Sequence, residues 1–398
     1  MISLTKIRYG LEQVWRAAIN EKAAVALWRT PGDAEVHLLA DFSRSLLKGR
    51  LNLQHAEQGF AVCPFLSPEG NESLTLRPDL HLTYRDGQLY QETSIHLPGK
   101  FEASLGTGLN QPIPYHLNLR PDTEISGQKQ HFMAMVEEGI KAIKLGEFDK
   151  VVTARTFDSP LSPGFNVVDQ FNKLEKAHPY AFVSLISIPE RGTWMGASPE
   201  LLVETLGHER FRTVSLAGTK PFPAQGDLKN AVWNQKEIEE QALVSRFIIE
   251  QFKTIRLREF EESGPRSVRA GSMIHLKTEY TVNMEETNFP ELGTVMLQLL
   301  HPTSAVCGMP KFNALRFILA HEDLKREFYS GFLGPLNING KTSLYVNLRC
   351  MQIMRKRVVL YAGAGITHDS NPEDEWAETD LKCQTLLAAM NGKNESGA

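Results

Sequence analysis

Residues 361–382, YAGAGITHDSNPEDEWAETDLK, join a β-type run to a helix, and the rest of the chain is organised around them. The run RVVLYAGAG stops on small residues, as a strand does where it meets a turn. Asn371 followed by Pro372 is typical of a helix N-cap and first helical position, and Ser370 with Glu373 would form an alternative capping box. Both alternatives predict a helix that begins close to the glycine-rich end of a strand.

Three ionisable side chains share one face of this predicted helix. Glu375, Glu378 and Lys382 stand at positions i, i+3 and i+7, a spacing that stacks them on successive turns. Gly363 and Gly365 would let a ligand approach the backbone of the preceding strand closely. The pattern favours a site that holds a cation and an anionic substrate together. The alternative is an ordinary solvated helix with acidic residues in its first turn, where the helix dipole stabilises them.

Length, charge and cysteine content limit the class of protein. The 398 residues include 42% hydrophobic residues, enough for a large core in one big domain or two ordinary ones. The formal net charge of −4 and a pI near 6.3 argue against nucleic-acid and membrane partners. The N-terminus lacks a signal-peptide pattern, so we expect a cytoplasmic protein. Four cysteines without metal-type spacing fit reduced thiols, namely Cys63, Cys307, Cys350 and Cys383.

The predicted elements divide the chain into two parts. Residues 1–115 open with an amphipathic helix and continue as short β-type runs separated by Gly, Pro and Asp turns. Residues 112–122 are the expected connection, and from Ser126 helical and β-type patterns alternate as far as residue 392. Near the end, Asn339 and Gly340 predict a two-residue turn in a β-meander.

Lys150 and Glu200 have structural explanations when each is taken alone. Lys150 opens the strand-like run DKVVTARTFD and would be an exposed lysine at a strand end. Glu200 follows Ser198 and Pro199, a pattern typical of a helix start, where its carboxylate would stabilise the first turn. The local sequence leaves both explanations open.

Four further candidates lie in the second part of the chain. Glu237 and Glu240 again stand at i, i+3, in the helical pattern NQKEIEEQALVSRFIIEQF, and Glu240 lies where the polar face meets the apolar face. His275 has apolar neighbours, as a hydrogen-bonded core histidine would. The meander places Arg349 on a strand next to the glycine-rich one, where it could grip a carboxylate through two parallel hydrogen bonds.

Ordered motifs fill the last two thirds of the chain: DKVVTAR, GASPELL, LAGT, KEIEEQ, HL, HPTSAVCG, the pair Glu322 and Arg326 before FYSG, NLRC, YAGAGI and EWAETDLK. In this order they resemble the motifs of the chorismate-utilising enzymes and, within them, the isochorismate synthases. The resemblance implies one α+β domain over residues 1–398, with two antiparallel β-sheets packed face to face and helices outside. Residues 1–115 would be the β-rich N-terminal part of this fold. Residues 126–392 would form the chorismate-binding core, with the active site between the two halves.

The resemblance assigns a metal to the acidic residues. Glu240 and Glu378 would bind one Mg²⁺, with Glu237 and Glu375 in supporting positions. This agrees with the chemistry of Mg²⁺, which takes few protein carboxylates, keeps waters and completes its octahedron with a substrate oxygen.

The implied reaction needs a base and an acid on opposite faces of the chorismate ring. Lys150 resembles the base, which would take a proton from the water that adds at C2, and Glu200 resembles the acid, which would protonate the hydroxide that leaves C4. These roles require a lowered lysine pKa and a raised glutamic acid pKa. We count His275 with these two as a catalytic candidate.

The residues expected to bind the substrate come from several motifs. Arg349 and Lys382 would bind carboxylates, and backbone and side chains from other motifs would line the pocket. The full set is Gly218, Thr219, Ala305, Tyr329, Leu348, Arg349, Gly363 and Lys382.

Three features favour an isochorismate synthase over its relatives. Anthranilate synthases do not carry a lysine like Lys150, aminodeoxychorismate synthases have a nucleophilic lysine where Ala217 stands, and HPTSAVCG resembles the isochorismate form. Ser304 and Gln241 depart from the proline and histidine that are usual in the family. We therefore expect a monomeric, Mg²⁺-dependent isomerase without an amidotransferase subunit, acting in menaquinone synthesis. A siderophore pathway and a salicylate synthase that also eliminates pyruvate stay open as alternatives.

Overall fold

Two antiparallel β-sheets with surrounding helices make up the described part of the chain. The computed structural model describes residues 5–7, 9–67, 70–94, 97–108, 110–119, 128–222, 228, 231–270 and 273–391. One sheet has eleven strands and the other has nine. Neighbouring strands in both sheets are antiparallel. The predicted α+β class is confirmed.

The eleven-stranded sheet joins strands from both ends of the chain. Its spatial order is β1 (Thr5–Ile7), β8 (Gln88–Ser94), β7 (Leu80–Arg85), β3 (Val36–Asp41), β2 (Ala24–Arg29), β10 (Phe182–Ile188), β11 (Gly192–Ser198), β19 (Cys350–Ile353), β20 (Arg357–Ile366), β9 (Lys150–Pro160) and β16 (Gly308–Met309).

The nine-stranded sheet has the same mixed origin. Its spatial order is β14 (Glu261–Ala270), β15 (Met273–Asn283), β13 (Arg210–Pro221), β12 (Leu201–Leu206), β18 (Lys341–Val346), β17 (Phe332–Leu336), β5 (Gly59–Cys63), β6 (Glu72–Leu76) and β4 (Leu47–Arg50).

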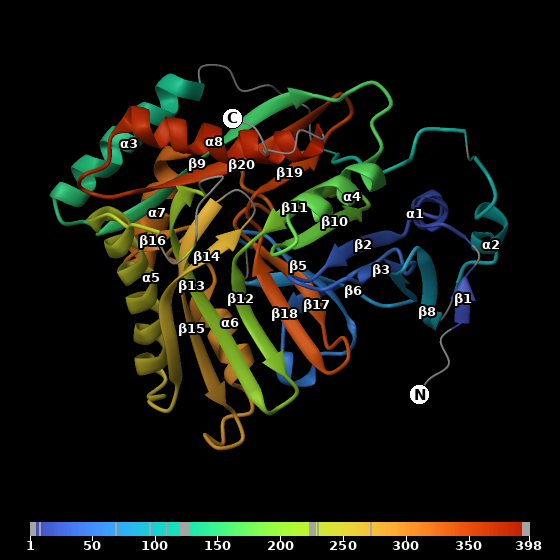
Figure 1. Cartoon of the computed structure of the whole chain (residues 1–398), viewed down its shortest axis with the longest axis horizontal. Helices are drawn as coiled ribbons and strands as arrows, with labels where there is room; N and C mark the ends of the chain where they lie inside the picture. Colours follow the sequence, from blue (N-terminus) through green and yellow to red (C-terminus); the bar gives the residue numbers. More distant parts are fainter. Residues whose placement is uncertain are drawn as a thin grey trace.

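Helices cover the outer faces of the sheets. Figure 1 shows α8 over β9 and β20, and α5 beside β13 and β15. No helix in the described ranges is long and apolar enough to cross a membrane. The helices are α1 (Leu11–Asn20), the 3₁₀ turn η1 (Leu53–His55), α2 (Phe101–Ser104), α3 (Gln128–Lys144), α4 (Val167–Ala177), α5 (Gln235–Thr254), α6 (Leu292–Leu300), α7 (Lys311–His321) and α8 (Pro372–Met390).

Aromatic side chains fill the space between the two sheets. Phe182 of β10 stacks on Tyr345 of β18 with ring centroids 4.2 Å apart. Trp28 of β2 packs on Phe60 of β5 at 5.0 Å. Each pair joins one sheet to the other, and burial of such rings contributes roughly 25 cal/mol per Å² of apolar surface. The face-to-face packing expected from the sequence is therefore confirmed.

The N-terminal strands are integral to both sheets. β2 pairs with β10, where Leu27 lies opposite Leu185, and β5 pairs with β17, where Val62 lies opposite Leu333. Strands from residues 1–115 therefore share hydrogen bonds with strands of the later part. The boundaries 1–115 and 126–392 stay predictions, and residues 120–127, which include Ser126 and part of the expected connection, lie outside the described residues.

Local sequence signals correctly predict one helix start and one hairpin turn. The Asn371 side chain accepts hydrogen bonds from the backbone N–H groups of Glu373 and Asp374 at 3.0 and 3.3 Å and so caps α8. Asn339 and Gly340 join β17 to β18 with φ of 54° and 78°, the left-handed conformations of a two-residue hairpin turn.

Two local interpretations are wrong, and one strand end differs by a residue. Glu200 does not begin a helix, because Pro199 and Glu200 form the short connection between β11 and β12, two strands in different sheets. Arg349 lies one residue before β19 rather than on it, with φ of 47°. β20 ends at Ile366, one residue beyond the predicted run RVVLYAGAG, and Gly363 and Gly365 still pair with β9.

Candidate active site

A cavity of about 110 Å³ lies between the two sheets and gathers most of the predicted site residues. β9 and β20 form one wall, β13 and β15 the opposite wall, and the helices α5 and α8 close one side. The predicted residues that line it are Lys150, Glu200, Gly218, Glu240, His275, Ala305, Tyr329, Leu348, Arg349, Gly363, Glu378 and Lys382. Sequence motifs that lie far apart along the chain thus meet at one place.

Lys150 is buried at the start of β9. Its side chain is 2% exposed and its Nζ lies 3.5 Å from Oε1 of Glu240. A Cβ atom at Gly365, on the neighbouring strand, would lie 2.8 Å from Cε of Lys150. A side chain at position 365 would therefore displace the Lys150 side chain. The absence of a side chain at Gly365 thus has a steric explanation that does not involve a turn. Lys150 is not the exposed strand-end lysine of the alternative explanation.

Glu200 is the second buried ionisable group of the cavity. It is 6% exposed, and its Oε1 lies 3.4 Å from the hydroxyl of Thr303. Burial raises the pKa of Glu200 to about 7, although Thr303 and the charge of Lys150 act in the opposite direction. A carboxyl group with this pKa holds its proton near neutral pH and can donate it.

Glu378 and Lys382 face each other one turn apart on α8. Glu378 Oε1 and Lys382 Nζ are 2.8 Å apart, and the same ammonium donates to the carbonyl of Gly363 at 2.8 Å. Burial opposes the charge on Glu378, but Lys382, together with Lys236 and Lys150, outweighs it and holds the pKa of this carboxyl below its usual range. From α5, Glu240 accepts a hydrogen bond from the backbone N–H of Gly218 at 3.3 Å.

Glu237 and Glu375 lie outside the cavity wall. Glu237 accepts from the backbone N–H of Asn234 at 2.8 Å in a capping box at the start of α5, and its Oε2 lies 3.3 Å from Lys220 Nζ. Glu375 is 1% exposed and accepts from the hydroxyl of Ser370 at 2.7 Å. Burial and the charge of Glu378 raise the pKa of Glu375.

The donor atoms fit a magnesium ion held by two carboxylates. Among the described residues, no group of three or more His, Cys, Asp or Glu side chains is close enough to hold a metal by itself. Carboxylates from both helices nevertheless act on Lys236. Burial alone would lower the pKa of Lys236, but the attraction of Glu375, Glu378 and Glu240 outweighs burial and raises this pKa. Hard oxygen donors, few in number and open to water and substrate, suit Mg²⁺.

Arg349 and His275 form a fixed pair on the opposite wall. Arg349 donates from Nη2 to Nε2 of His275 at 2.9 Å, and Nδ1 of the ring lies 3.2 Å from the carbonyl oxygen of Gly218. Since arginine can only donate, Nε2 carries no proton and Nδ1–H is the donor to Gly218. Burial and the charge of Arg349 lower the pKa of His275 to about 3. The ring is thus a neutral acceptor that orients Arg349.

The other predicted substrate contacts are close to the glycine-rich strand. The ring of Tyr329 stacks on Tyr361 at 5.4 Å, and a Cβ atom at Gly363 would lie 2.8 Å from the Tyr329 hydroxyl oxygen. Leu348 and Ala305 line the same cavity. The side chain of Thr219 lies outside the described residues.

Several lining residues were missed by sequence reasoning. Val152, Leu216, Val306, Tyr361 and Ala362 line the cavity, and of these only Val306 and Ala362 adjoin a residue that was predicted. Thr303, which contacts Glu200, lies in HPTSAVCG, a motif that was recognised without a role for this hydroxyl. Position within a recognised motif was the signal that could have found them.

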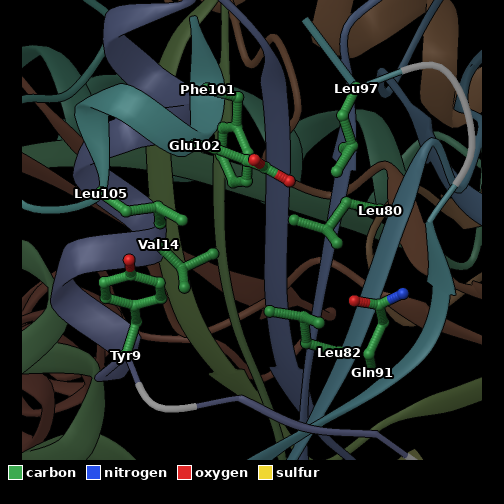
Figure 2. A pocket seen from close by; sticks show the side chains of 9 residues that line it. All are labelled: Tyr9, Val14, Leu80, Leu82, Gln91, Leu97, Phe101, Glu102 and Leu105. Carbon is green, nitrogen blue, oxygen red and sulfur yellow. The ribbon is translucent and has the colours of Figure 1, made fainter. Parts of the chain in front are cut away.

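A second cavity, of about 280 Å³, lies at the far end of the eleven-stranded sheet. Figure 2 shows Leu80 and Leu82 facing Val14 and Leu105 across it. Its lining is mostly apolar, and none of the predicted site residues reaches it. Volume alone therefore does not identify the active site, and the cavity between the sheets is the candidate.

Comparison with known proteins gives consistent matches. The family model described as "Chorismate binding enzyme" matches residues 88–391. The chain is 30% identical over 288 residues to the isochorismate synthase DhbC of Bacillus subtilis, covering 69% of this chain and 70% of that protein. It is 31% identical over 346 residues to the salicylate biosynthesis isochorismate synthase of Pseudomonas aeruginosa, covering 78% of this chain and 68% of that protein. The fold is similar to that of MenF, the menaquinone-specific isochorismate synthase from Escherichia coli, with a TM-score of 0.74 and 24% identity over 97% of this chain and 94% of that chain.

Proposed function

The chain belongs to the chorismate-binding enzymes, and from this premise we propose that it is an isochorismate synthase, an isomerase that converts chorismate to isochorismate. The observation that carries the proposal is the pair Lys150 and Glu200, both buried and both lining one cavity. The relatives from Bacillus subtilis and Pseudomonas aeruginosa, each named as an isochorismate synthase, support the same reaction.

Lys150 and Glu200 have complementary roles in the proposed reaction. Lys150 takes a proton from the water whose oxygen bonds to C2 of the ring. The ring double bond shifts as the C4 oxygen leaves, and Glu200 gives its proton to that oxygen, so that water is both consumed and released. A Glu200 pKa of about 7 keeps this proton in place until the bond breaks.

The remaining groups of the cavity bind and orient the substrate. Arg349, held by His275, and Lys382, held by Glu378, are the cations proposed to bind its two carboxylates. The backbone of Gly218, Thr219 and Gly363 and the side chains of Ala305, Tyr329 and Leu348 would complete the pocket. In this scheme His275 positions Arg349 and does not itself transfer a proton.

Glu240 and Glu378 are the residues proposed to hold Mg²⁺, and Glu237 and Glu375 would support them from outside the cavity wall. When bound, the ion supplies positive charge that holds and orients a substrate carboxylate. Menaquinone synthesis is the proposed destination of the product, with siderophore synthesis as the alternative. A monomeric state, a cytoplasmic location and the absence of an amidotransferase subunit stay predictions.

Product identification tests the proposal directly. The purified protein is incubated with chorismate and Mg²⁺, and the products are separated by liquid chromatography. We expect isochorismate in equilibrium with chorismate and little pyruvate. Equal amounts of pyruvate and salicylate would instead assign the salicylate synthase activity. Recovery of unchanged chorismate would reject both enzymes and leave a protein that only binds chorismate.

A further inference from the structure

Glu322 and Arg326 form a buried ion pair behind the wall of the cavity. Their side chains are 3% and 2% exposed, and neither residue lines the cavity itself. Arg326 Nε and Nη2 each donate to one oxygen of the Glu322 carboxylate, both at 2.7 Å. This two-pronged contact fixes the plane of the guanidinium. The pair belongs to a motif recognised in the sequence to which the proposed reaction gives no role.

The pair makes hydrogen bonds to two backbone segments that line the cavity. Arg326 donates from Nη1 to the carbonyl of Val306 and from Nη2 to the carbonyl of Val152, both at 2.8 Å. On the other side, Glu322 accepts from the backbone N–H of Ala154 at 3.1 Å. Residues 308–309 of the loop 301–310 already pair with β9 as β16, and the Val152 N–H donates to the Cys307 carbonyl at 2.9 Å. The guanidinium extends this attachment to Val306, next to Ala305.

The chemistry of the pair indicates a purpose beyond stability. Taking two charges out of water is costly, and an apolar pair of similar volume often stabilises a fold as well or better. An apolar pair cannot hydrogen-bond two carbonyl groups at a fixed separation. Lysine cannot reproduce the contact either, because a single ammonium lacks the planar fork of the guanidinium. Only an arginine can tie both segments and its own carboxylate partner together.

We infer that Arg326, oriented by Glu322, is a positioning residue that fixes the Ala305–Val306 part of the loop 301–310, which lies beyond the β16 pairing, at a set distance from β9. It thereby sets the distance between Lys150 and the Ala305–Val306 part of the cavity wall. This inference rests on the proposed function, since it concerns the geometry in which Lys150 acts. Arg326 touches neither the substrate nor the proton-transfer atoms.

The test compares Arg326→Lys with a matched control, Arg29→Lys. The Arg29 side chain is similarly buried, at 3% exposed, pairs with Glu175 at 3.1 Å and donates to the carbonyls of His178 and Pro179, none of which lines the cavity. For Arg326→Lys we expect kcat to fall at least about tenfold, because small misplacements of catalytic groups have large effects on rate. KM for chorismate should change less than about threefold, because Arg349 and Lys382 are retained. Arg29→Lys should lower thermal stability but keep kcat.

A double variant and an independent readout complete the test. Glu322→Leu with Arg326→Met replaces the charges by apolar groups, so it should fold even if Arg326→Lys does not, and it should show the same loss of kcat. Amide hydrogen exchange should rise in residues 301–310 and 150–156 of both Arg326 variants and not in Arg29→Lys. Unchanged kcat in a folded Arg326 variant, or an equal loss in Arg29→Lys, overturns the inference. Failure of the wild-type protein to form isochorismate rejects the proposed function instead. The exchange data then report only on whether Arg326 holds residues 301–310 against β9.

Discussion

The helices α5 and α8 carry the same acidic pattern and use it differently. Each has two glutamates at i, i+3, and in each the second one, Glu240 or Glu378, lines the cavity. The first ones diverge: Glu237 caps its own helix, whereas Glu375 is buried between Ser370 and Lys236. Identical spacing therefore does not define identical roles. The role of each glutamate depends on how deeply its carboxylate is buried and on which residue of another element pairs with it.

The largest expected fall in activity follows from the removal of either carboxylate that lines the cavity. Glu240→Ala and Glu378→Ala should each reduce kcat/KM by about 10³-fold or more, since a near-octahedral Mg²⁺ site with two protein ligands cannot replace one of them easily. Steady-state rates with increasing Mg²⁺ measure this. Exhaustive chelation of the wild-type protein should have the same effect, and full turnover after chelation would contradict the metal assignment.

The next largest effect concerns the buried groups that these helices face. Lys150→Ala and Glu200→Gln should each lower kcat by about 10²-fold or more, because each removes a proton-transfer partner. In the wild-type protein the rate should fall as the pH rises above about 7, because Glu200, with its pKa of about 7, then loses the proton that it must donate. A pH–rate profile measures this fall in rate at high pH, and the profile of Glu200→Gln should not show it.

A smaller effect is expected at the buried first glutamate of α8. Glu375→Gln keeps the size of the side chain and its contact with Ser370 but removes the charge next to Glu378. The apparent affinity for Mg²⁺ should fall about tenfold while kcat at saturating Mg²⁺ is largely kept, as for groups that support metal ligands. An unchanged Mg²⁺ titration would place Glu375 among purely structural residues.

The smallest effect is expected at the first glutamate of α5. Glu237→Ala should lower the free energy of unfolding by about 1 kcal/mol through loss of the capping box, with a weaker effect on Mg²⁺ affinity than Glu375→Gln. Glu237→Gln is the matched control, because an amide oxygen can still accept from the Asn234 N–H. Chemical denaturation of both variants decides the point. A Mg²⁺ affinity loss in Glu237→Ala as large as in Glu375→Gln would make the two helices equivalent after all.

The sequence predicted features that depend on neighbouring residues better than features that depend on strand pairing. The Asn371 cap and the Asn339–Gly340 turn are local, and both are confirmed. Taken alone, the pattern Ser-Pro-Glu favoured a helix start at Glu200, but Glu200 lies in the connection between β11 and β12, which belong to different sheets. The position of the Lys150 side chain depends on Gly365, which is distant in sequence and is brought next to it by the pairing of β9 with β20.

The candidate site shows the same division. The glutamates of α5 and α8 could be found from helical spacing and Arg349 from its place in the predicted meander, whereas Lys150 and Glu200 were assigned only through the family resemblance. Neither source predicted that His275 would be a neutral acceptor for Arg349, because that depends on the distance between β15 and the connection before β19. The hydrogen bond from Thr303 to Glu200 has the same nonlocal origin.

The position of the last four strands determines when this protein can complete its fold. β19 and β20 separate β11 from β9 in one sheet, and β18 and β17 separate β12 from β5 in the other. A chain that is synthesised from its N-terminus therefore carries four strands with missing neighbours until residues beyond 332 have emerged. Open strand edges pair readily with other chains. The nascent protein consequently depends on the synthesis of β17 to β20 to close both sheets, and a truncation before β17 would leave both open to aggregation.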